Sequence, residues 1–88
     1  MPIISMFYGI IVRMYKENTA KHNKPYVHAE YSGDEAVVSL EGELLEGNIA
    51  QAKMKLLLAW LETHKEDLSV NWKLLSNGEQ YFKIDPLK

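Results

Sequence analysis

Two histidines and a glutamate in the segment KHNKPYVHAEYSGDE (residues 21–35) are the residues best suited to chemistry in this sequence. His28 and Glu30 are two residues apart, so on a β-strand their side chains point to the same face. His22 lies in the polar stretch before them and can fold back toward His28. Imidazole and carboxylate groups together suit proton transfer or the binding of a divalent transition metal.

Besides a non-catalytic binding surface, three interpretations of this cluster stay open. In the first, His22 and His28 are ligands of a metal ion such as zinc, although the spacing fixes no further ligand. In the second, which needs no metal, the two histidines act as acid and base, Glu30 orients an imidazole and Arg13 holds an anion. In the third, these residues form a solvated strand face with cross-strand polar pairs. No cofactor is predicted except the metal ion of the first interpretation.

The strands that would position these residues follow from the hydrophobic pattern. Residues 6–15 (MFYGIIVRMY) are mainly aromatic or β-branched and predict one strand. Its even-numbered side chains would meet the core, and its other face, with Arg13, would be partly exposed. Residues 26–31 predict a second strand whose odd-numbered side chains are buried. Pairing of these two strands would bring Arg13 close to His28 and Glu30.

The remaining residues predict further strands and then two helices. Residues 16–24 are expected to form a loop, Ser32-Gly33-Asp34 a turn, and residues 35–40 and 43–46 two more strands. Asn48 with Gln51, and Thr63 with Glu66, resemble capping boxes, so helices are expected to begin near residues 48 and 64. Asn77-Gly78 would end the second helix, and residues 79–88 would be an extended tail that can return to the sheet edge.

The sequence therefore predicts an α+β fold in one domain of residues 1–88. Residues 1–47 would form a small antiparallel β-meander of three to five strands, and residues 48–78 two helices packed on one of its faces. Trp60 and Trp72 occupy core positions in the apolar pattern of these helices.

Composition narrows the classes of function. The net charge is −2 and the lysines are scattered among acidic residues, which disfavours nucleic-acid binding. No cysteine is present, so disulfides and thiolate metal sites are excluded. The apolar run MKLLLAWL is too short to span a membrane, and the first residues lack the features of a signal peptide. We expect a soluble cytoplasmic protein.

The chain resembles the small prokaryotic proteins grouped as domain-of-unknown-function family 4160 (DUF4160). The stretches that carry this resemblance are FYGIIVRMY, HAEY, EAVVSLEGELLEG, AWLETHKEDLSVNW and KIDPL. The family motif is similar to His-x-Pro-Pro-His-x-His, which stands here as His22-Asn23-Lys24-Pro25-Tyr26-Val27-His28. Tyr26 replaces the middle histidine, which removes one potential metal ligand.

The resemblance implies no activity, but it suggests an association with other small genes, in the manner of toxin–antitoxin pairs. The sequence thus favours a protein-interaction module, which binds a protein partner or forms a homodimer, over an enzyme. The alternatives are a histidine-dependent hydrolase or nuclease and a nucleic-acid-binding module. Tyr15 and Tyr26 are the candidate binding residues, since tyrosine rings on a sheet can stack on a ligand.

Overall fold

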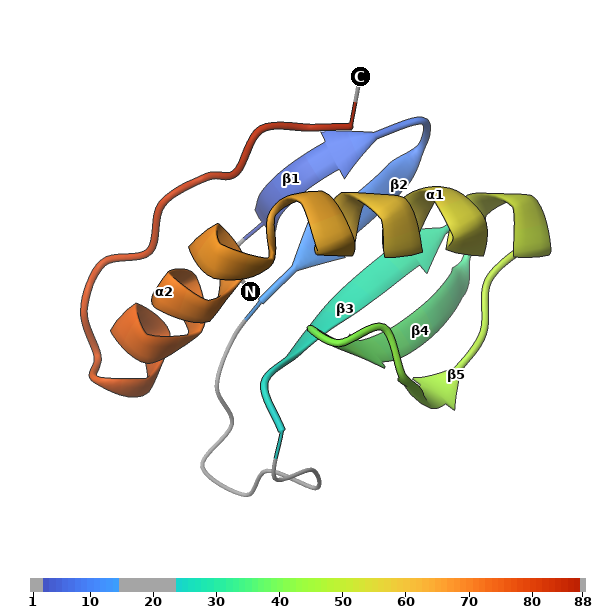
Figure 1. Cartoon of the computed structure of the whole chain (residues 1–88). Coiled ribbons are helices and arrows are strands. Elements are labelled where there is room, and N and C mark those ends of the chain that lie inside the picture. Colours follow the sequence, from blue (N-terminus) through green and yellow to red (C-terminus); the bar gives the residue numbers. More distant parts are fainter. Residues whose placement is uncertain (1–2, 15–23, 88) are drawn as a thin grey trace.

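The chain folds into a five-stranded antiparallel sheet followed by two helices, as seen in a computed structural model that describes residues 3–14 and 24–87 (Figure 1). Each strand pairs with its neighbour in sequence, in the order β1-β2-β3-β4-β5, so the sheet is a meander. The predicted α+β fold is confirmed. The elements are β1 (Ile3–Phe7), β2 (Ile10–Arg13), β3 (Tyr26–Tyr31), β4 (Asp34–Ser39), β5 (Leu44–Gly47), α1 (Gln51–Thr63) and α2 (Lys65–Ser76).

The first strand was predicted as one element, and this prediction is wrong. A turn at Tyr8-Gly9 divides it into β1 and β2, which pair with each other. Both turn residues have positive φ, 50° and 81°, as a two-residue hairpin turn of type I′ requires. A tyrosine in the first turn position hid the turn, because aromatic residues are typical of strands.

This turn changes which side chains reach the core. Met6 and Tyr8 were expected to be buried, but they are 59% and 53% exposed. Phe7 and Ile10 close the hairpin as a cross-strand pair and are buried. The expectation holds for Ile10 and for the two even-numbered residues that follow it, Val12 and Met14, which are fully buried.

The β3–β4 hairpin follows the predicted pattern closely. β3 has the predicted bounds, and Val27 and Ala29 on its predicted inner side are fully buried. Ser32 and Gly33 form the turn, both with positive φ. Asp34 belongs to β4 and pairs with Tyr31 instead of lying in the turn. The strand predicted as the fourth, over residues 43–46, is present one residue later as β5, Leu44–Gly47.

The two helices cover the inner face of the sheet. α1 crosses the sheet (Figure 1), and its buried residues are Leu57, Trp60 and Leu61. Trp60 is fully buried, and its ring lies 5.2 Å from the ring of Phe7, centroid to centroid. Burial of such apolar surface, at about 25 cal/mol per Å², is the main force that holds the helix on the sheet. α2 adds Leu68 to this core.

Neither helix is capped as predicted. Ala50, not Asn48, precedes α1, and no side chain caps it. The Asn48 backbone N–H donates to the carbonyl of Glu35, so Asn48 extends the β4–β5 pairing. Thr63 Oγ1 donates to the carbonyl of Ala59 one turn earlier and leaves the start of α2 uncapped. The predicted helix break at Thr63-His64 is nevertheless confirmed.

Residues 79–87, called here the C-terminal segment, are extended and contain no assigned strand. The backbone N–H of Ile84 donates to the carbonyl of Ile4 in β1 at 2.8 Å, so the segment reaches the sheet edge as predicted. It passes the helices and runs beside β1 (Figure 1). Asn71 of α2 is fully buried and bonds its backbone, a role that the sequence pattern did not indicate.

Gly47 and Gly33 allow a matched test of the β4–β5 pairing. Both have positive φ, but a Cβ at Gly47 would overlap the carbonyl oxygen of Glu35, whereas a Cβ at Gly33 meets nothing. Gly33→Ala is expected to cost about 1–2 kcal/mol for backbone strain alone. Gly47→Ala should cost at least about 1 kcal/mol more, because β4 and β5 must also move apart. Urea unfolding measures both changes, and equal losses would contradict the assigned close approach.

Candidate functional site

The outer face of the sheet, opposite the helices, holds the residues with candidate chemistry. The strand register aligns them in two rows that cross the strands. The first row runs from β1 to β4 and consists of Met6, Ile11, Glu30 and Glu35. It begins with two apolar side chains and ends with two carboxylates, so the outer face changes from apolar to acidic across the sheet.

The second row lies beside the first and runs from β2 to β5. It consists of Arg13, His28, Val37 and Glu46. His28 therefore sits directly opposite Arg13 on one side and Val37 on the other. The sequence alone placed Arg13, His28 and Glu30 on one face if the strands paired, and the register brings them together there.

Arg13 and Glu30 form an ion pair on the outer face. The Arg13 Nη1 donates to Glu30 Oε2 at 2.9 Å, and the two side chains are 23% and 39% exposed. They are diagonal neighbours on adjacent antiparallel strands, within reach for long side chains. Because both groups remain partly in water, the pair is expected to contribute at most about 1 kcal/mol. Arg13 is thus engaged with a carboxylate of its own chain.

His28 is held between an aromatic ring and a carboxylate. Its Nδ1 lies 4.0 Å from Glu35 Oε1, and its side chain is 17% exposed. Its ring centroid is 5.6 Å from that of Tyr26. An imidazole and a carboxylate at this distance can attract each other when the histidine is protonated.

Tyr26 is buried, with 3% of its surface exposed. Its ring contacts the ring of Trp72 in α2 at 5.1 Å between centroids, as well as His28. A chain of aromatic contacts therefore links the helical layer to the second row. A ring enclosed in this way offers little surface for stacking on a base or a peptide.

Two candidate residues, His22 and Tyr15, lie outside the residues that the structure describes. The third histidine, His64, stands at the junction of the two helices, with its ring 5.7 Å from that of Trp60. Within residues 3–14 and 24–87, no three histidine, aspartate or glutamate side chains are grouped to hold a metal ion.

The exposed apolar residues at the β1–β2 hairpin were not among the predicted site residues. Met6 starts the first row, and Tyr8 follows two residues later in the turn. Among the described tyrosines of the sheet, Tyr8 is the most exposed, whereas the ammonium group of Lys53 lies 5.2 Å from the ring centroid of Tyr31. The one local signal for the turn is Gly9, a glycine inside an otherwise strand-like run.

The sequence matches the family described as "Domain of unknown function (DUF4160)" over residues 9–73. The chain belongs to this family. No curated protein and no solved structure gives a match. The matched range includes the second row and most of the first, but it leaves out Met6, Tyr8 and the C-terminal segment. In the described part of the chain, no helix has the length and apolarity to cross a membrane.

A double-mutant cycle tests whether the charged pair of the outer face is a minor structural contact. Arg13→Met, Glu30→Gln and the double variant are unfolded in urea, and the coupling free energy is expected to be about 0.2–1 kcal/mol, falling at high salt. A coupling above about 2 kcal/mol would instead mean that the pair is desolvated and supports the β2–β3 register.

Proposed function

We propose that this protein is a protein-interaction module that binds a protein partner through the outer face of its sheet. The observation that carries the proposal is the exposure of Met6, which pairs with the half-buried Ile11, and of Tyr8 in the turn that follows β1. Clustered exposed apolar side chains bordered by charges are typical of protein-binding surfaces. Here Arg13 and Glu30 form the border.

Charge supports a partner of a particular chemistry. The charged residues of the two rows are mostly acidic. Arg13 is basic, and the other three are the glutamates Glu30, Glu35 and Glu46. A partner that presents an apolar side chain flanked by lysine or arginine would complement both halves of this face. A second copy of the chain would bring carboxylates against carboxylates, which favours a different protein over a homodimer.

The same acidic balance disfavours a nucleic-acid partner, whose phosphates require basic side chains. The hydrolase or nuclease alternative requires a second imidazole beside His28. The residue predicted for that role, His22, lies outside the described residues, and the proposed function rests on the outer face. We further propose a cytoplasmic location and a role in a two-gene, toxin–antitoxin-like pair, which the resemblance to the family suggests.

Tyr8→Asn separates partner binding from stability. Asparagine tolerates positive φ better than most residues, and Tyr8 has φ 50°, so the variant should unfold at the same urea concentration as wild type or a higher one. Loss of the exposed ring should weaken partner binding by at least about tenfold, as expected for an aromatic anchor. Val70→Asn is the matched control, because Val70 is 50% exposed but lies on α2.

The measurement is co-purification from the native host with the tagged full-length chain. The expected result is one protein recovered in equimolar amount with wild type and Val70→Asn, released by salt, and lost with Tyr8→Asn. Light scattering after size-exclusion chromatography gives the oligomeric state of the isolated chain, expected to be a monomer. A monomer that retains no partner, or a partner that is retained equally by Tyr8→Asn, would refute the proposal.

A further inference from the structure

The C-terminal segment is bound to the rest of the molecule mainly through its own backbone. Asn71 donates from Nδ2 to the carbonyl of Phe82 and accepts at Oδ1 from the N–H of Phe82, each at 2.9 Å. The indole N–H of Trp60 donates to the carbonyl of Asp85 at 2.8 Å. With the bond between Ile84 and Ile4, four hydrogen bonds recognise backbone groups that nearly every residue possesses.

Ile84 is the most deeply buried apolar side chain of the segment, and Tyr81 and Leu87 pack partly against the core. Ile84 is 5% exposed and belongs to the hydrophobic core, whereas Phe82, two residues earlier, is 38% exposed. The backbone bond from Ile84 to β1 holds the Ile84 side chain against the core. Backbone bonds with an apolar pocket for one side chain are the features of peptide recognition by strand addition.

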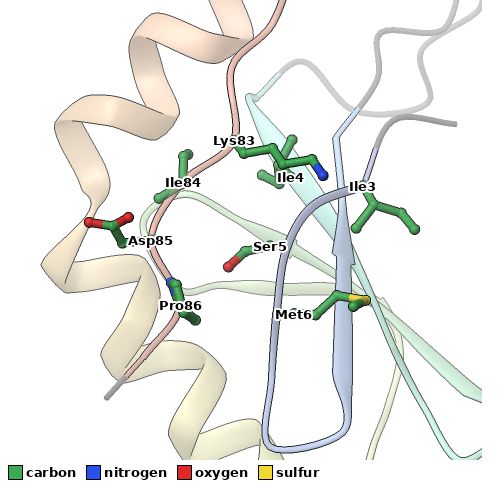
Figure 2. Close-up of a pocket in the computed structure, with 8 residues that line it drawn as sticks. All are labelled: Ile3, Ile4, Ser5, Met6, Lys83, Ile84, Asp85 and Pro86. Carbon is green, nitrogen blue, oxygen red and sulfur yellow. The ribbon is translucent and has the colours of Figure 1, made fainter.

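The segment fills only part of the edge of β1. A pocket of about 340 Å³ opens between residues 3–6 and residues 83–86, next to the bond between Ile84 and Ile4. Figure 2 shows that the two segments run in the same direction on either side of this pocket. Pro86 has no backbone N–H and cannot continue the pairing. The carbonyl of Ile4 points away from β2, toward the C-terminal segment. Because backbone groups alternate in direction along a strand, the N–H and C=O of Met6 are the next groups that point the same way.

Ser5 adds an unfilled polar contact to this pocket. Its side chain points from β1 toward Asp85 and Pro86 (Figure 2). The residue is 7% exposed, and its Oγ has no hydrogen-bond partner among the described residues. Buried hydroxyl groups in proteins are nearly always bonded, so a ligand that brings a donor or acceptor to Ser5 would complete the site.

We propose that the groove between β1 and the helices is a peptide-binding site, which the C-terminal segment occupies in its own chain and which an extended segment of a partner protein can take. The partner segment carries a β-branched aliphatic residue at the place of Ile84 and a residue with an N–H at the place of Pro86. This site shares Met6 with the outer face, but it binds through the β1 backbone, Trp60 and Asn71 and does not depend on the proposed function.

The experiment uses the full-length chain with Ile84→Lys, which removes the aliphatic anchor from the segment but leaves the groove intact. The probe is a fluorescein-labelled peptide of residues 79–88 (EQYFKIDPLK), followed by fluorescence anisotropy. We expect Ile84→Lys to bind it at least about tenfold more tightly than wild type, because a tethered segment competes at millimolar effective concentration. A probe with lysine at the position of Ile84 should not bind.

Phe82→Lys is the matched control chain, since the same change is made at an exposed side chain whose backbone still bonds Asn71. It should exclude the probe as wild type does. The proposal is overturned by a folded Ile84→Lys chain that does not bind the probe, or by equal binding to Phe82→Lys. Adding Tyr8→Asn to the Ile84→Lys chain should leave probe binding unchanged. The experiment therefore tests the groove independently of the proposal for the outer face.

Hydrogen exchange of the wild-type chain keeps the test decisive if Ile84→Lys does not fold. A replaceable segment must open without global unfolding, so the Ile84 amide should exchange at least about tenfold faster than the amide of Val38 in the sheet centre. Equal protection of the two amides would mean that the segment leaves only when the whole domain unfolds, and no peptide could then replace it.

Discussion

The burial of Trp60 is the interaction on which the rest of this structure depends. Its fully buried indole packs against Phe7 of β1, and its N–H bonds the carbonyl of Asp85. One side chain therefore holds α1 on the sheet and fixes the C-terminal segment beside β1. The bond to Asp85 also satisfies the indole N–H, which would be costly to bury without a partner. A domain of this size has a limited core, so a large residue shared by three elements matters more than it would in a larger protein.

With the helices on one face, the chemistry of the chain is confined to the outer face and the edges of the sheet. On the outer face, Arg13 and Glu30 neutralise each other, and His28 is packed against Tyr26 and near Glu35. These polar groups are engaged within the chain, whereas Met6 and Tyr8 of the β1–β2 hairpin are exposed. At the β1 edge, the C-terminal segment is held through its backbone. We propose that the two surfaces make protein contacts of different types, one through side chains and one through backbone.

Sequence patterns predicted the elements that form through local interactions. They failed where the conformation or burial of a residue depends on residues far away in the sequence. β3 could be predicted from alternation alone, because its inner residues are apolar and its outer ones polar. The turn at Tyr8-Gly9 could not, because strand-like residues surround it and the tyrosine accepts positive φ only when pairing of β1 with β2 compensates for the strain. Tyr26 was placed on the face it does occupy, but its burial depends on Trp72, which is far away in sequence. The role of Asn71 was missed for the same reason, since its partner is the backbone of Phe82.

The sequence by itself therefore determined the fold class, the succession of a β-meander and two helices, and the face that carries Arg13, His28 and Glu30. These follow from hydrophobic periodicity and from the rule that neighbouring strands in a meander pair with each other. Only the tertiary structure decided the register that aligns the two rows, the exposure of Tyr8, and the attachment of the C-terminal segment. The physical reason is that exposure and hydrogen bonding depend on which surfaces meet after the chain has closed long loops, and local residue patterns carry no information about those partners.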